Sequence, residues 1–130
     1  MSDISYDKIK HLVEVDDDIL AAFTVLSGKE DSIDNLSIAE NTNFTKEFID
    51  NVHLCLQDIF RDLGTSIKIN SILGRLKWKV CEYDHVRMLL IFEKDRVVTV
   101  LIKSDTSLHE TVDNILGYYF EAEGIPKSLF

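Results

Sequence analysis

Residues 76–103, LKWKVCEYDHVRMLLIFEKDRVVTVLIK, decide the fold. They hold three runs typical of β-strands, at 76–83, 86–93 and 96–103, with polar pairs between them. In the first run Trp78 alternates with Lys77 and Lys79, which indicates a strand with one exposed face. The other two runs are almost continuously apolar and β-branched, as in strands covered on both faces. The stretch predicts an antiparallel meander whose first strand is an exposed edge.

Around this meander, hydrophobic spacing predicts three helices and two further strands. In chain order they are a helix at 5–15, a strand at 19–26, a short edge strand at 32–39, a long helix at 45–63 and a closing helix from Ser107 to Gly124. Residues 66–73 fit either a strand or a helical turn. The fold class is therefore α+β, a single antiparallel sheet of about five strands between helices, in the order α-β-β-α-β-β-β-α. Residues 1–130 form one domain, with 124–130 as a short C-terminal tail.

Composition excludes several classes of protein. The net charge is −9 and the pI about 4.8, so a phosphate backbone would be repelled and no nucleic-acid partner is expected. No apolar run is long enough to insert in a membrane, and the N-terminus lacks a secretory pattern, so we expect a cytoplasmic protein. Cys55 and Cys81 are then expected to be reduced, buried core residues.

Motifs that carry chemistry are absent from the sequence. The glycines are isolated from one another, which argues against a phosphate-binding loop. The four histidines lack the spacing of metal ligands and are interpreted as surface or partly buried residues. We therefore expect no catalytic residue, no metal and no cofactor, and a protein that is not an enzyme.

The long helix carries one residue that interrupts its pattern. Its apolar positions fill one arc that should be buried; they are Phe48, Ile49, Val52, Cys55, Leu56, Ile59, Phe60 and Leu63. Leu54 falls instead within the polar face. A single exposed leucine usually has no function, but it is also the best indication of a contact surface, and both interpretations stay open.

The order and lengths of the predicted elements resemble the roadblock family, the dynein light chain and prokaryotic regulator group of the roadblock, longin and profilin superfamily. The resemblance runs from Tyr6 to about Ala122 and is carried best by CEYDHVRMLLIFEKDRVVTVLIKSDTSLHETVDNIL at 81–116. A longer, acidic first hairpin at 29–35 and an extended segment at 66–73 depart from the family pattern. The chain thus resembles a divergent prokaryotic-type member.

The resemblance implies a non-enzymatic homodimer or heterodimer in which the long helix and the first meander strand meet their counterparts, and we expect a homodimer. Many members of the family bind small GTPases or act as scaffolds, so a GTPase is an expected partner besides a second copy. Carried over by element order, the interface positions are Asn51, Leu54, Asp58, Arg61, Lys77, Trp78 and Lys79. The alternative function is a small-ligand sensor with an apolar pocket lined by Tyr83, Phe92 and Tyr118.

Overall fold

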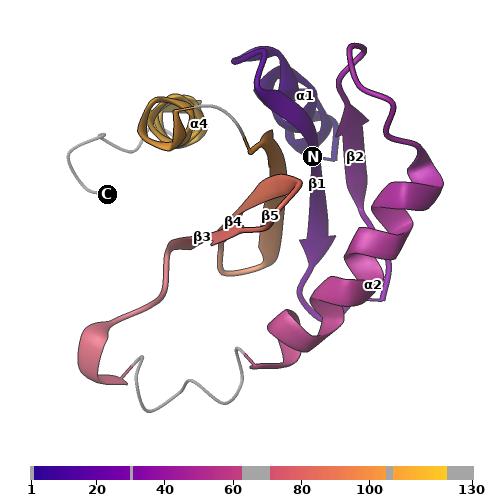
Figure 1. Ribbon diagram of the computed structural model, residues 1–130. Helices are drawn as coiled ribbons and strands as arrows, with labels where there is room; N and C mark the ends of the chain where they lie inside the picture. The colour runs from indigo at the N-terminus through magenta and orange to yellow at the C-terminus, as the bar shows by residue number, and fades with distance from the viewer. Residues whose placement is uncertain (1, 30, 63–70, 105–106, 123–130) are drawn as a thin grey trace.

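A computed structural model describes residues 2–29, 31–62, 71–104 and 107–122. The elements, in chain order, are α1 (Ser2–Glu14), β1 (Ile19–Leu26), β2 (Asn35–Ile38), α2 (Lys46–Asp62), β3 (Trp78–Glu82), β4 (Val86–Phe92), β5 (Arg96–Lys103) and α4 (Leu108–Ala122). This order confirms the predicted α+β class. Figure 1 shows α1 and α4 on one side of the sheet and α2 running diagonally across the other.

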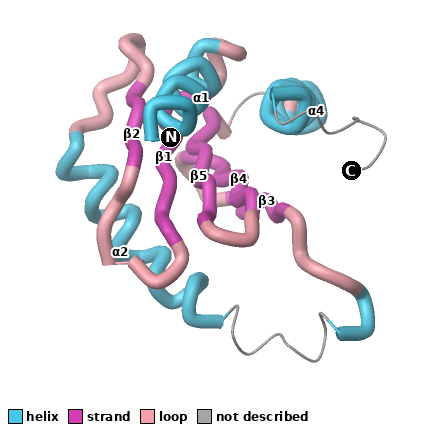
Figure 2. The backbone as a smooth tube through the Cα atoms, turned by 180° about the vertical axis from the view of Figure 1, so that it is seen from behind, coloured by secondary structure: helices cyan, strands magenta, loops and turns pink. Residues whose placement is uncertain are grey.

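The five strands form one antiparallel sheet in the order β2-β1-β5-β4-β3. The tube in Figure 2 can be followed from β2 at one edge to β3 at the other. The meander predicted from residues 76–103 is present, with turns at the two expected polar pairs. Because β1 pairs with β5, the N-terminal hairpin adds to the far side of the meander. This addition leaves β3 as an edge, as the alternating lysines predicted.

The sheet separates two apolar clusters. The cluster on the α1 and α4 side includes Leu12, Val100 and Ile115, and the cluster on the α2 side includes Phe23, Ile49 and Leu101. In β4, Met88 belongs to the α2-side cluster and Leu89 to the other, and in β5 Leu101 and Val100 are divided in the same way. Both faces of these strands are therefore buried, which explains their continuous hydrophobicity. A register irregularity at the start of β1 disturbs this alternation locally.

Side-chain bonds fix the ends of several elements. The Thr45 hydroxyl accepts a hydrogen bond from the N–H of Phe48 (3.1 Å) and so caps the start of α2. The Asp16 carboxylate accepts one from the N–H of Asp18 (2.9 Å), which closes the aspartate-rich turn before β1. Asp16 also accepts a bond from the Asn114 side chain (3.1 Å), linking this turn to α4.

Burial differs from the prediction at three positions of α2, one of which is Phe48, an arc position that is 39 % exposed. Cys55 was expected in the core but is exposed, while His53 is 4 % exposed and more deeply buried than expected. The helix buries a stripe narrower than the apolar arc, centred on Ile49 and Leu56, because it crosses the sheet diagonally. The His53 ring meets Phe23 edge-on and its Nε2 lies 3.2 Å from Gln57 Nε2, so its polar edge is satisfied inside the protein.

Other predicted boundaries are shifted or lie outside the described residues. The strands β2 and β3 are shorter than the runs predicted at 32–39 and 76–83. Residues 71–73 form a helical turn, while the rest of the ambiguous segment 66–73 lies outside the described residues. The tail at 124–130 also lies outside them. The same holds for the Ile59 and Phe60 side chains and for Leu63.

A buried polar cluster ties α4 to the β4–β5 turn. Tyr119 is 1 % exposed, and its hydroxyl donates a short hydrogen bond to the Glu93 carboxylate. Arg96 pairs with the same carboxylate (Nε to Oε2, 2.9 Å), and the Lys8 ammonium lies 3.6 Å from the centre of the Tyr119 ring. Burial opposes the charge of Arg96, but Glu93, Tyr119 and Asp95 outweigh it and raise the Arg96 pKa.

This cluster makes a prediction about stability. Tyr119→Phe removes the hydroxyl that bonds to the Glu93 carboxylate, and a hydrogen bond to a charged group contributes about 1.5–3 kcal/mol. We expect urea denaturation to give a free energy of unfolding lower by about that amount. The control is Tyr118→Phe, which removes the hydroxyl of a half-buried neighbour and should change the free energy by less than about 0.5 kcal/mol. Equal effects of the two variants would contradict a special role for Tyr119.

Candidate interaction surface

The edge strand β3 is the most exposed strand of the sheet. Lys77, Lys79 and Glu82 are exposed, and Trp78, Val80 and Cys81 are half-buried, whereas the paired strand β4 is mostly buried. Just before β3, the large apolar side chains of Ile72, Leu73 and Leu76 are also exposed. An exposed edge with apolar residues beside it is typical of a contact surface.

The hydrogen bonds of β3 show which of its backbone groups face solvent. The N–H of Phe92 donates to the C=O of Lys77 (2.9 Å), and the N–H of Tyr83 donates to the C=O of Val86 (3.0 Å). Residues of an antiparallel strand alternate between bonding to the neighbour and pointing away from it. The odd-numbered residues of β3 therefore bond to β4. The N–H and C=O groups of Trp78, Val80 and Glu82 point to the open edge.

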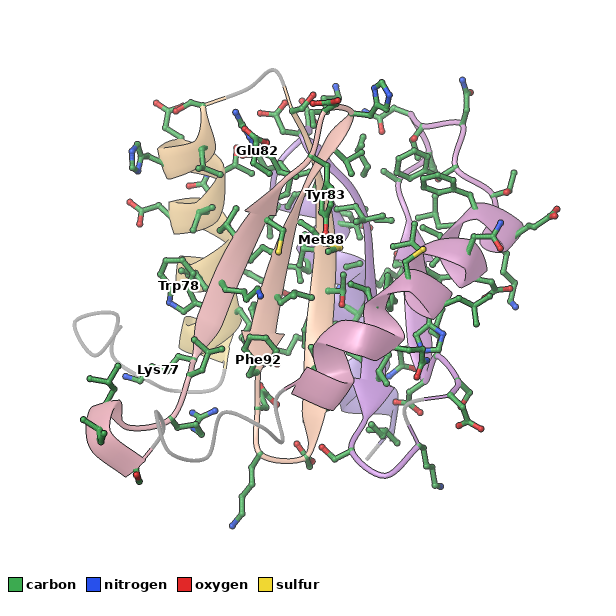
Figure 3. All side chains as sticks on the ribbon, turned by 60° about the horizontal axis from the view of Figure 1, so that its bottom comes forward. Lys77, Trp78, Glu82, Tyr83, Met88 and Phe92 are labelled. Carbon is green, nitrogen blue, oxygen red and sulfur yellow. The ribbon has the colours of Figure 1, made fainter. Side chains whose placement is uncertain are left out.

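The side chains of β3 alternate between the two faces of the sheet. Trp78 and Val80 pack against the α1 and α4 cluster, and Cys81 packs against the α2 cluster. Figure 3 shows Trp78 on the α4 side of the strand, with Tyr83 and Met88 nearer α2. Lys79 shares the Cys81 face because the two are separated by one residue. The three predicted positions on β3 are therefore divided, with the lysines on one face and Trp78 on the other.

Two open grooves flank this strand. On the α4 side a groove of about 410 Å³ lies between β3 and α4, and Trp78 and Val80 form one of its walls. On the other side a smaller groove of about 210 Å³ lies between α2 and the β3–β4 hairpin. Its lining is almost wholly apolar and consists of Val52, Cys55, Leu56, Tyr83, Val86, Met88 and Leu101. The edge strand thus has apolar surface on both of its sides.

The outer face of α2 forms a second surface. Leu54 is 64 % exposed, as the sequence predicted, and Asn51 is exposed beside it. Leu54 borders an open groove of about 460 Å³ between α2 and the connection from β1 to β2. Its lining holds the carboxylates of Asp31 and Asp34 and the Lys46–Asp50 ion pair (3.3 Å). Asp58 and Arg61 follow on α2, but their side chains lie outside the described residues.

The structure therefore separates the predicted interface into two patches. The edge patch contains Lys77, Trp78 and Lys79, and the helix patch contains Asn51 and Leu54. Leu54 borders the groove toward the β1–β2 connection, and it is Cys55, on the adjacent flank of α2, that faces the β3–β4 hairpin. The sequence predicted Cys55 in the core, so the exposure of this flank of α2 was not predicted. The position of Cys55 on the helix gives no signal that it is exposed.

The sensor alternative receives little support from the geometry. Tyr83 lines the groove beside α2, whereas Tyr118 packs on the α1 and α4 side of the sheet, so the two do not share a pocket. The groove that Tyr83 lines is smaller than the 300–1,000 Å³ usual for small-molecule sites. The grooves of about 410 and 460 Å³ fall within that range, but neither is lined by Tyr83, Phe92 or Tyr118. Within the described ranges, no group of histidine, cysteine and acidic side chains is placed to hold a metal ion. The described helices include none that is long and apolar enough to cross a bilayer.

Comparisons with solved structures identify the fold. The chain is similar to MglB from Myxococcus xanthus (13 % identity, TM-score 0.64, covering 99 % of this chain and 92 % of that one) and to a Roadblock/LC7 domain from Streptomyces avermitilis (8 %, 0.62, 92 % and 94 %). It is also similar to an MglB with a tetrameric arrangement (8 %, 0.65, 95 % and 90 %). No family model and no curated protein matches the sequence. The fold is therefore roadblock-like, as the element order predicted.

The different exposure of the two cysteines can be measured. Cys55 is exposed and Cys81 is half-buried, so we expect a thiol reagent such as DTNB to modify Cys55 faster by about tenfold. Cys55→Ser should remove the rapid phase of the reaction, and Cys81→Ser should keep it. If the rapid phase survived in Cys55→Ser, the placement of α2 on the sheet would be wrong.

Proposed function

We propose that this protein is a non-enzymatic interaction module that works as a homodimer, with two copies joined along β3. The observation that carries the proposal is the open edge of β3, where Trp78, Val80 and Glu82 direct their backbone groups away from the sheet. A second β3 strand offers the same donors and acceptors, so pairing would satisfy both edges and continue the sheet. The exposed apolar residues beside β3 favour burial in such a contact.

The outer face of α2 is proposed as the second contact surface, for another protein or another dimer. Its positions are Asn51, Leu54, Asp58 and Arg61. The exposed Leu54 provides an apolar anchor beside the acidic groove of Asp31, Asp34 and Asp50. A structurally similar MglB has a tetrameric arrangement, and a tetramer built from dimers needs two distinct surfaces on each chain.

A small GTPase is the partner class that we propose, because many members of the roadblock family bind small GTPases and this chain has a roadblock-like fold. The net charge of −9 adds a physical requirement for any partner. The surface that meets the acidic groove beside Leu54 should be basic, since complementary charges speed association and like charges oppose it. Regulation or scaffolding in the cytoplasm would then follow from bringing partners together, with no chemistry on this chain.

The role of the β3 edge can be tested by removing one N–H group. In Val80→Pro the lost N–H points to the open edge, so the β3–β4 ladder keeps its hydrogen bonds while pairing with a second copy is blocked. We expect light scattering to show a dimer for the natural protein. The dissociation constant of the variant should be at least about thirtyfold higher, because each of the two copies loses one hydrogen bond of about 1 kcal/mol.

Two controls separate backbone pairing from other effects. Val80→Ala keeps the N–H and should remain dimeric. Cys81→Pro removes a group that faces β4 and should lower the free energy of unfolding, which Val80→Pro should not do to a comparable extent. A natural protein that is monomeric at tens of micromolar, or a Val80→Pro variant that dimerises normally, would refute the β3 seam.

The helix patch has a separate test. Leu54→Glu replaces an exposed anchor with a negative charge in a groove that already holds the Asp31 and Asp34 carboxylates besides the Lys46–Asp50 pair, and a charge buried in an interface weakens binding by several kcal/mol. We expect the β3 dimer to keep its mass while concentration-dependent association beyond the dimer is lost. Leu54→Ala, which removes only apolar contact, should have a smaller effect. Dissociation of the dimer itself by Leu54→Glu would instead place α2 in the dimer seam.

A further inference from the structure

The hydrogen-bond pattern of β3 restricts how two copies can align. This step rests on the proposed dimer. A twofold axis perpendicular to the sheet makes the two edge strands antiparallel. In such a pair, two residues that lie opposite each other either both direct their backbone N–H and C=O groups outward, toward the partner strand, or both direct them inward, toward their own sheet. Only Trp78, Val80 and Glu82 point outward, so each must face one of these three residues in the partner.

We infer that the axis passes through Val80, so that Val80 faces the partner's Val80 and Trp78 faces the partner's Glu82. This alignment pairs the entire strand Trp78–Glu82. Every other alignment allowed by the alternation moves the axis by at least one residue and leaves part of the strand without a partner. Backbone groups left unpaired inside an interface are costly, which favours the complete pairing.

The charged side chains of β3 also favour an axis at Val80, first on the α2 face of the sheet. An axis through Lys79 would bring two lysine ammonium groups directly opposite each other, and like charges in that arrangement are destabilising. On the opposite face, which Glu82 shares with Trp78 and Val80, an axis through Glu82 would likewise bring two carboxylates opposite each other. With the axis at Val80, each Lys79 faces the partner's Cys81, and no like charges are opposed.

Side chains on the α4 face give an independent argument. Trp78 is half-buried beside α4, and its indole N–H has no hydrogen-bond partner among the residues that the structure describes. Solvent reaches this N–H in the single chain, but pairing along β3 would cover it, and a buried indole N–H usually finds an acceptor. With the axis at Val80 the partner's Glu82 lies opposite Trp78. The Glu82 carboxylate is exposed and binds Arg87 (2.8 and 2.9 Å), yet it keeps the capacity to accept a further bond.

Disulfide cross-linking distinguishes the alignments. In a Cys55→Ser background, which removes the exposed thiol of α2, Lys79→Cys places a new thiol opposite the partner's Cys81. Directly opposed residues of this type have Cα atoms about 4.5 Å apart, within the range for a disulfide. Mild oxidation should give a covalent dimer on non-reducing gels, faster by at least about tenfold than in the background protein, where Cys81 faces Lys79.

Each other outcome assigns a different arrangement. Rapid cross-linking of the background protein through Cys81 alone would move the axis to Cys81 and overturn the inference. Rapid cross-linking of Lys79→Cys combined with Cys81→Ser would move it to Lys79 and overturn it equally. A dimer by light scattering that none of these thiols links would place the axis at an end of β3 or outside it, and would overturn the inference in either case. A monomer would refute the proposed function itself, so the two failures are distinguishable.

Discussion

The requirement that buried backbone groups be paired governs this structure. The strands β1, β5 and β4 are covered by apolar clusters on both faces, so no water reaches their N–H and C=O groups. Each of these three strands therefore needs a hydrogen-bonded neighbour on both of its sides. On the outer side of β1 this neighbour is β2, and on the outer side of β4 it is β3. The shorter and less buried strands, β2 and β3, accordingly stand at the edges.

The distribution of helices follows from the same sheet. Two helices, α1 and α4, share one face, and among the described elements only α2 lies on the other. A single diagonal helix cannot cover five strands, so apolar residues of the β3–β4 hairpin remain beside it in an open groove. The groove thus results from incomplete cover by helices, whereas the exposed edge results from the strand order, and the two lie side by side at the β3–β4 hairpin.

Most of the fold could be predicted from the sequence because its signals are local. The runs at 86–92 and 96–103 are apolar without interruption, and only strands buried on both faces require this. The lysines around Trp78 correctly indicated an edge. The burial of α2 was predicted less well, since helical spacing gives the apolar arc but not the angle at which the helix crosses the sheet. That angle exposes Cys55 and buries His53.

The candidate site was only partly accessible from sequence. Leu54 could be recognised because it interrupts a polar face, and its exposure was confirmed. Its separation from Trp78 could not be foreseen, since it depends on which strands lie between α2 and the edge. The directions of the β3 backbone groups likewise depend on the pairing with β4, and so they follow from the hydrogen bonds alone.

The two edges of the sheet are unequal, and this inequality bears on how far assembly can proceed. β2 is a four-residue strand and β3 a five-residue strand with apolar neighbours, so the sequence presents one good edge and one poor one. An isologous contact between two good edges uses both of them and closes. A head-to-tail contact of β3 with β2 would leave a free edge at each end and grow into a filament. In the proposed β3 dimer, the shorter edge strand β2 therefore disfavours open-ended polymerisation.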